Sequence, residues 1–469
     1  MKTKLQHWWQ EMRLSFWFVP AVIVLSAVAL ATVLIAVDAN VDLHSVERWP
    51  LFFGAGAVGA RGLLTTVASS MITVAGVVFS ITIVALALTS SQYTSRVLRN
   101  FMRDPINQVV LGVFVGIFAY CLVVLRTIRS GDEGTFVPSL AVLVGLILAV
   151  VGIAFLIYFI HHISMSIQAS SILAAAAQDT IKAVDHLFPN ALSKNADEEA
   201  DGHWAIFLAE HTWTAIPAQK TGYIENVGLD ALLTLARERG IILRMERGIG
   251  EFVVEDSPLI SAAGPGELDE QMTAELNALY VISRQRLVEQ DVAFGIRQIV
   301  DVALKALSPG INDTTTAVMC VDYLTAILVR LSVRRIVTSL RLDQGELRVI
   351  ARGPSFKSLL AEAFDQIRQN AEANVAVLTR LLQALETIAG QATNTRRRRA
   401  LSQQADLIAS AARRTISTIS TPHDMADIDI SLARLSHILG DHFQEHVSRM
   451  NGTELSQCSK VFYRVFKFS

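Results

Sequence analysis

The side chains in this sequence with the clearest capacity for chemistry are hydroxyls within an apolar stretch, residues 63–88, which contains no charged residue. Four of them recur at spacings of four, three and seven, so a helix would present them on one face. They are Thr66, Ser70, Thr73 and Ser80, with Gly76 in a neighbouring stripe of small residues. In hydrocarbon such a face needs hydrogen-bond partners, from a second helix, from its own carbonyls or from water. The pattern predicts either close helix packing or a pathway lined with water or ions.

A basic stripe follows this stretch. Arg96, Arg99 and Arg103 repeat at i, i+3 and i+7 in a predicted amphipathic helix that ends at Asp104-Pro105. The stripe indicates contact with anionic lipid at the inner membrane face. In an oligomer, a ring of these arginines would instead form a vestibule that attracts anions.

A third group of polar residues lies in a predicted turn between two helices. Asp291 is the expected N-cap of the first helix, which begins at Val292 and stops at Ser308-Pro309-Gly310. Asn312 or Asp313 is then expected to cap the second helix. The turn predicts a structural corner with a satisfied cap, or a cation or phosphate site built from Ser308, Asn312 and Asp313.

Four consecutive arginines, 396–399, are expected in a loop between helices at 357–388 and 400–419. Such a run is typical of a solvated connector or of a contact with acidic lipid. Nucleic-acid binding is not expected, because the net charge is −2 and no aromatic residues interleave with the arginines.

Signatures of an enzyme or a metal site are missing from the sequence. It contains no Gly-x-Ser-x-Gly, His-Glu-x-x-His or phosphate-loop motif. The three cysteines, Cys121, Cys320 and Cys458, are too few and too scattered for a disulfide framework or a thiolate zinc site. We therefore expect no catalytic residues, no metal and no cofactor.

The elements that must position these groups follow from an uneven distribution of charge along the 469 residues. Residues 1–160 contain 17 charged side chains and residues 161–469 contain 67, so charge is about half as dense in the first part. Four apolar stretches there reach the roughly 20 residues that a helix needs to cross a bilayer. The predicted spans are about 16–37, 63–88, 108–125 and 137–160, within a transmembrane domain of residues 1–165.

None of these spans contains Asp, Glu, Lys, Arg or His, which argues against a carrier coupled to protons or ions. Six Lys or Arg residues flank the spans on one side and four on the other, so the bias favours both termini inside. The large, cysteine-poor C-terminal region agrees with a cytoplasmic location. We expect a multi-pass protein of the cytoplasmic membrane.

The remainder is expected to be mixed α+β and mostly helical. Residues 166–202 read as a helical continuation of the fourth span to about Leu187, followed by an acidic loop. Residues 203–262 suggest a small α+β or β-barrel module, with strands at 204–208, 222–224, 241–245 and 251–254 around a helix at 229–239. Residues 263–469 suggest a helical cytoplasmic domain, with a hairpin near 337–349 and a last helix at 430–450.

Several strings resemble a known family. They are Met71-Ile72-Thr73-Val74-Ala75-Gly76, Ser90-Ser91-Gln92-Tyr93, Arg96-Val97-Leu98-Arg99-Asn100-Phe101, Gly222-Tyr223-Ile224, Gly250-Glu251-Phe252-Val253 and Leu307-Ser308-Pro309-Gly310-Ile311-Asn312-Asp313. Together they resemble domain-of-unknown-function 2254, predicted bacterial integral membrane proteins, over nearly the whole chain. The resemblance implies a bacterial membrane protein with a large soluble part and supplies no activity.

Two functions are consistent with these patterns. The first is a homo-oligomeric channel or channel-like pore, lined by the second span and regulated by the cytoplasmic domain. The second is a membrane-anchored scaffold or sensor without a conduction pathway, in which the hydroxyl face packs against other helices. In both, the expected partners are the lipid bilayer, anionic lipid in particular, and further copies of the chain.

Overall fold

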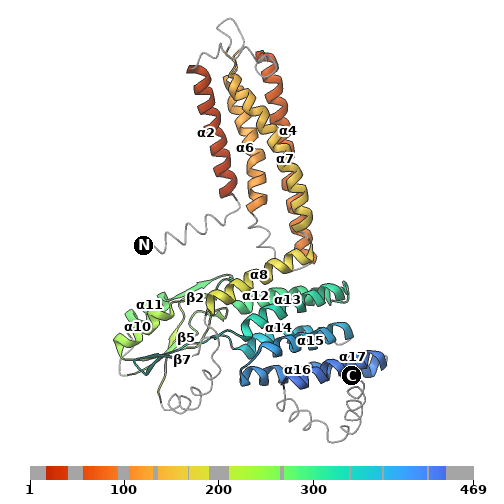
Figure 1. The fold of residues 1–469 in the computed structure, drawn as a ribbon. Helices are drawn as coiled ribbons and strands as arrows, with labels where there is room; N and C mark the ends of the chain where they lie inside the picture. The colour runs from red at the N-terminus through yellow and green to blue at the C-terminus, as the bar shows by residue number, and fades with distance from the viewer. Residues whose placement is uncertain are drawn as a thin grey trace. The chain divides into compact units, whose positions relative to one another are not determined.

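The chain forms two compact units, residues 1–172 and 173–469, each described here by itself. A computed structural model describes residues 17–40, 56–92, 105–129, 136–166, 168–189, 211–264, 269–336, 340–371, 374–419 and 422–439. The structure is mainly helical, with a smaller proportion of strand. Figure 1 shows helices alone in the described part of unit 1, and helices together with strands in unit 2.

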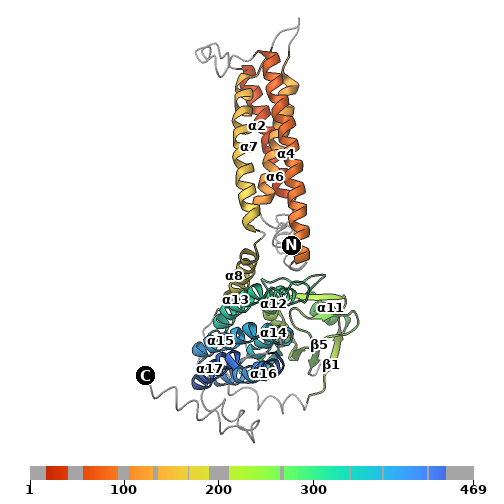
Figure 2. The ribbon, with the colours of Figure 1, turned by 90° about the vertical axis from the view of Figure 1, so that its right-hand side faces the viewer.

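Four long helices run side by side in unit 1 (Figures 1 and 2). They are α2 (Phe18–Asn40), α4 (Ala57–Gln92), α6 (Pro105–Thr127) and α7 (Ser139–Ser166). Each contains one of the predicted spans and is long and apolar enough to cross a membrane. Helix α6 contacts the other three helices, and ten of its residues are buried.

The contact surface of α4 repeats every three or four residues. Its buried side chains are Ala60, Leu64, Ala68, Met71, Ala75, Val78, Thr82 and Ala85, which pack against α6 and α7. This spacing resembles the seam of a coiled coil. On α7, Gly152 allows close approach, since a Cβ there would lie 3.1 Å from Met71 Sδ. One face of α4 is therefore buried against α6 and α7 of the same chain.

Polar contacts join the helices at one end of unit 1. The Asp38 carboxylate, at the end of α2, accepts hydrogen bonds from the amides of Leu140 and Ala141 in the first turn of α7. A carboxylate is favoured there by the dipole of the helix. Arg61 donates to the carbonyl of Ile128 over 2.7 Å, at the same end of the bundle. At this end of the bundle, the first contact joins α2 to α7 and the second joins α4 to the end of α6.

A fifth apolar helix lies in unit 2. Helix α13 (Thr314–Ser332) is also long and apolar enough for a span, but it is less hydrophobic than the other four. It contacts α12, α14 and α15, and nine of its residues are buried. Within unit 2, α13 is therefore packed on several sides as a core helix.

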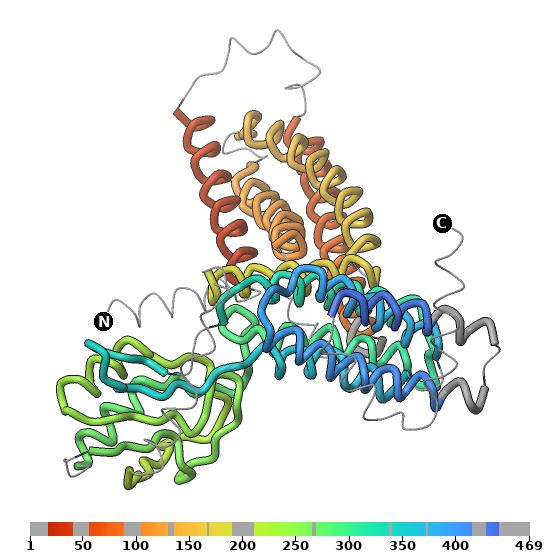
Figure 3. Tube along the Cα trace, turned by 60° about the horizontal axis from the view of Figure 1, so that its bottom comes forward, coloured from red at the N-terminus to blue at the C-terminus, as the bar shows by residue number. Residues whose placement is uncertain are grey.

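The described residues of unit 2 form two sheets. In Figure 3 the segments that contain their strands lie to one side of the helices of the same unit. The five-stranded sheet has the order β1 (Thr214–Pro217), β5 (Pro258–Ala263), β3 (Ile242–Met245), β8 (Glu346–Ile350) and β7 (Leu340–Asp343). The three-stranded sheet has the order β4 (Phe252–Val253), β2 (Gly222–Val227) and β6 (Tyr280–Ser283). All pairings are antiparallel except β3 with β8. Helix α10 (Leu229–Arg239) packs on the larger sheet, and α11 (Glu270–Ala278) contacts β6.

The sequence predicted part of these sheets. The helix at 229–239, three of the strands and the hairpin around residues 343–345 are confirmed. Strands β1, β5 and β6 were missed, and β6 interrupts the region from residue 268 that was expected to be helical. The sheets also continue past residue 262, because β8 pairs with β3 across about a hundred residues. The predicted strand at 204–208 lies outside the described residues.

Apart from α10 and α11, the helices of unit 2 form a stack (Figure 3). Besides α13, they are α8 (Ala169–Leu187), α12 (Val292–Ala306), α14 (Phe356–Asn370), α15 (Val375–Gln391), α16 (Thr395–Ile419) and α17 (Pro422–Leu439).

Two predictions about these helices are wrong. The single helix expected at 357–388 is divided, because Asn374 caps a new helix, α15. The continuous helix expected from the fourth span to Leu187 is also wrong. Helix α7 ends at Ser166, where the Gln168 amide turns back to the carbonyl of Met165.

The close approach of α8 and α12 gives a prediction for stability. A Cβ at Gly295 would lie 2.3 Å from Thr180 Oγ1, whereas a Cβ at Gly390, in an exposed part of α15, would meet nothing within 4 Å. Gly295→Ala should therefore lower the free energy of unfolding by about 1–3 kcal/mol. Gly390→Ala should be neutral or raise it by up to about 1 kcal/mol. Thermal unfolding of the two variants checks this, and equal effects would contradict it.

A second prediction concerns pH. Asp185 of α8 pairs with Arg330 and Arg334, at 2.7 and 2.8 Å. The hydrogen bond from Arg330 holds the pKa of Asp185 below its ordinary value. The pair therefore stabilises the fold above the unfolded pKa, about 3.9, and this contribution is lost as pH falls through the folded pKa.

Asp185→Asn should accordingly lower the unfolding midpoint by no more than a few degrees at neutral pH, since exposed ion pairs are weak. The difference from the parent protein should shrink on acidification below the folded pKa. Melting curves at neutral and acidic pH measure both values, and a difference that grows in acid would refute this account.

Candidate functional site

The predicted hydroxyl face of α4 is exposed in the chain. Thr66, Thr73 and Ser80 each donate a hydrogen bond of 2.8 Å to a carbonyl four residues earlier in the same helix. Ser70 is exposed as well. The hydroxyls of these three residues are thus satisfied by the backbone of α4, as the packing interpretation expects. Their exposure leaves room for a further partner.

The structure sharpens the outline of this face. Six small residues follow each other at spacings of four and three: Gly62, Thr66, Ser69, Thr73, Gly76 and Ser80. We call them the small-residue stripe of α4. All six are exposed, and a Cβ at Gly62 or Gly76 would meet no atom within 4 Å. Each of the six lies two positions from a buried residue, about 200° around the helix. The face predicted from the sequence included Ser70, which lies outside this stripe, and did not include Gly62.

The turn after α12 is held together by its own polar groups. Ser308 donates to the carbonyl of Lys305, and Asn312 has a left-handed backbone with φ +48°. Asp313 accepts from both the amide and the hydroxyl of Thr316, at 3.0 and 2.6 Å. These bonds lower the pKa of Asp313 and confirm it as the cap of α13. A cation or phosphate on this turn stays a prediction.

The basic stripe predicted after the second span cannot be located in the structure. Arg96, Arg99 and Arg103 lie outside the described residues. No group of three or more His, Cys, Asp or Glu side chains in the described ranges has the arrangement of a metal site.

The run Arg396–Arg399 was expected in a loop. This prediction is wrong, because the four arginines lie at the start of α16. The Asn394 side chain accepts hydrogen bonds from the amides of Arg396 and Arg397 and so starts the helix.

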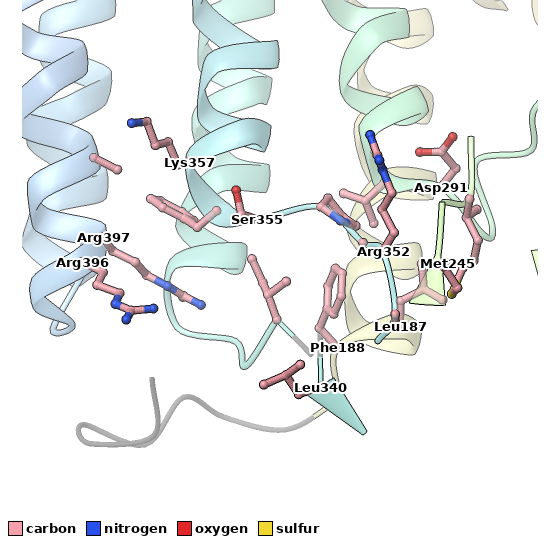
Figure 4. A pocket seen from close by; sticks show the side chains of 18 of the residues that line it. Leu187, Phe188, Met245, Asp291, Leu340, Arg352, Ser355, Lys357, Arg396 and Arg397 are labelled. Atoms are coloured by element: carbon pink, nitrogen blue, oxygen red, sulfur yellow. The ribbon is translucent and has the colours of Figure 1, made fainter. Parts of the chain in front are cut away.

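A cavity of about 670 Å³ lies in unit 2, where the sheets meet the helical stack. Figure 4 shows its apolar walls, which include Leu187, Phe188, Met245 and Leu340. Six cationic residues also line it: Arg341, Arg352, Lys357, Arg396, Arg397 and Arg399. Sequence reasoning missed this site, because its residues come from segments spread over about 200 positions. The one available signal was the arginine run directly after Asn394.

Asp291 is the single carboxylate among the described residues that line the cavity. It is 7% exposed, and both its oxygens are engaged. Oδ2 receives the Arg286 guanidinium at 2.7 Å, and Oδ1 caps α12 through the amide of Phe294. Burial raises the pKa of Asp291, while Arg286 and the amides of Phe294 and Ala293 act in the opposite direction. The carboxylate is therefore neutralised by its own neighbours.

Taken together, the apolar helices of unit 1 and the compact α+β unit 2 define a membrane protein with several candidate membrane-spanning helices. The chain belongs to the DUF2254 family of predicted membrane proteins, to which residues 13–387 match. It is 36% identical over 363 residues to an uncharacterized protein of Mycobacterium bovis and to one of Mycobacterium tuberculosis. The matches cover 76% of this chain and 68% of each relative. No solved structure shows significant similarity.

Proposed function

We propose that the chain forms a homo-oligomeric membrane channel in which α4 lines the central path and unit 2 regulates it. The observation that supports this is the small-residue stripe of α4, which is exposed although the opposite face is fully packed. From Gly62 to Ser80 the stripe rises about 27 Å, close to the roughly 30 Å of the hydrocarbon core. Small residues along a whole span favour close approach of neighbouring helices rather than contact with lipid.

In the proposed channel, four helices of each chain, α2, α4, α6 and α7, cross the bacterial cytoplasmic membrane. Helix α13 lies in the core of unit 2 and does not cross it. Both termini and unit 2 are cytoplasmic, with anionic lipid at the inner face near Arg96, Arg99 and Arg103. The assembly acts without a cofactor and catalyses no reaction.

A second candidate is a membrane-anchored scaffold or sensor. It is favoured by the hydrogen bonds of Thr66, Thr73 and Ser80 to their own helix, since satisfied hydroxyls need no water. In this case the stripes of neighbouring chains pack against each other in a dry interface. The two candidates share the oligomer and differ in conduction.

The experiment is a flux assay on the full chain. The purified protein is reconstituted into liposomes, the release of small ions and solutes is recorded, and the particle mass is measured by light scattering. The channel predicts an oligomer and flux above that of empty liposomes. An oligomer without flux under varied voltage, tension and ions supports the scaffold instead, and a monomer without flux rejects both.

A further inference from the structure

We propose that the cavity in unit 2 binds a small organic molecule that carries a phosphate group on an apolar body. The proposal does not depend on conduction by unit 1. It rests on the charge of the cavity wall, the helix ends that meet there, its apolar surface and its size.

The wall has a strong excess of positive charge. Six Lys or Arg side chains line the cavity and face one carboxylate, Asp291, which Arg286 and the first turn of α12 already neutralise. Lysine and arginine repel one another when they gather around a space of low dielectric constant. An anion in the cavity would relieve this repulsion, and arginine recognises phosphate through paired hydrogen bonds.

Two of the six cations have structural tasks. Arg397 is 4% exposed, and it donates to the carbonyls of Leu331 and Arg334 at 2.7 and 2.6 Å. Arg352 donates to Glu251 and to the carbonyl of Glu246. These contacts explain why the two residues are present. The wall also carries Arg341, Lys357, Arg396 and Arg399.

Arg341 supplies an independent observation. Its Nε atom is buried and has no hydrogen-bond partner within the described part of the chain. A buried donor without a partner costs free energy, and that cost falls when a ligand supplies an acceptor. Arg341 lies on β7 and Arg396 lies in the first turn of α16, so a ligand in the cavity would meet cations from two elements.

Three helices also begin at the wall. Asp291 and Val292 start α12, Ser355 and Phe356 start α14, and Asn394 caps α16. Each helix has at least 15 residues, so its N-terminus carries a positive partial charge. The N-terminus of α12 already faces the Asp291 carboxylate, so it is the fields of α14 and α16 that add to those of the side chains and favour an anion.

The apolar part of the wall indicates what carries the anion. Phe188, Met245, Leu340 and Phe356 line the same cavity as the cations. A volume of about 670 Å³ is far larger than inorganic phosphate needs and lies within the usual range for sites of organic ligands. A nucleotide presents the flat faces of an aromatic base and a phospholipid presents acyl chains, and each is joined to phosphate through an ester, so the shared chemistry is a phosphate ester.

The test is isothermal titration calorimetry on the full chain in detergent. The probes are ATP, dioctanoyl phosphatidic acid and inorganic phosphate, with adenosine and dioctanoylglycerol as uncharged counterparts. The arginine run provides a matched pair of variants, since Arg396 and Arg399 line the cavity and Arg398 does not. Arg398 instead donates to the carbonyl of Ala392.

We expect saturable binding of ATP or of phosphatidic acid, with inorganic phosphate weaker. The Arg396→Gln/Arg399→Gln double variant should bind at least tenfold more weakly, while Arg398→Gln should stay within about twofold of the parent protein. Binding of ATP alone identifies a nucleotide, and binding of phosphatidic acid alone identifies a lipid. The proposal is overturned if no phosphorylated probe saturates, if the uncharged counterparts bind equally well, or if the double variant binds like the parent.

Discussion

Replacing Asp291 by alanine should lower the free energy of unfolding of unit 2 by about 3 kcal/mol. The substitution removes the cap of α12, worth about 1 kcal/mol, and takes the Asp291 carboxylate away from a partly buried Arg286. Loss of a hydrogen bond to a charged group costs about 1.5–3 kcal/mol when the partner stays buried. The side chain of Arg286 is 24% exposed, so water compensates only part of this loss.

Asp269 provides the matched control. It caps α11 through the amide of Met272, but it is exposed. Asp269→Ala should therefore cost only the cap, about 1 kcal/mol. Chemical denaturation of both variants, together with Arg286→Met and the double variant Arg286→Met/Asp291→Ala, measures the coupling between Arg286 and Asp291. Equal effects of the two aspartate substitutions would show that the ion pair contributes nothing.

The second large effect is expected at the small-residue stripe of α4. Gly76→Leu places a bulky side chain where the chain itself leaves open space, so the fold of one chain should tolerate it. Close approach of neighbouring α4 helices would no longer be possible. We expect the particle mass to fall to that of a monomer and liposome flux to fall at least tenfold.

Val77→Leu is the control for this substitution. Val77 is half exposed and neighbours Gly76 on the helix, but it lies outside the stripe. This variant should keep the parent mass and flux. If Gly76→Leu keeps the oligomer and the flux, the stripe neither lines the central path nor lets the α4 helices of neighbouring chains approach around it.

Elements that depend on neighbouring residues could be predicted from the sequence, whereas elements that depend on distant parts of the chain could not. Helix α10, the cap of α12 by Asp291 and the hairpin at residues 343–345 were predicted because each depends on neighbours in sequence. Gln344 and Gly345 both adopt positive φ there, as a tight hairpin requires. Strand β6, in contrast, is only four residues long and directly follows α11, so no periodicity separates it from the helix.

The candidate sites show the same division. The hydroxyl face of α4 could be predicted, because helical spacing alone defines it. The cavity could not, because β7, α12, α14 and α16 must first be brought together by the fold. Gly250 illustrates this: its φ of +83° is common for glycine in a turn, but only the structure shows that a Cβ there would lie 2.1 Å from Asp291 Oδ2.

The most direct test of the proposed channel is a cysteine scan of α4 from Gly62 to Ser80. Cys121→Ala, Cys320→Ala and Cys458→Ser give a background without native cysteines. Single cysteines are introduced, the proteins are reconstituted, and a membrane-impermeant methanethiosulfonate is applied during the flux measurement. The account predicts block at Thr66, Ser69, Thr73 and Ser80, and none at the packed positions such as Leu64 and Met71. Absence of flux, or block without this helical period, would contradict it.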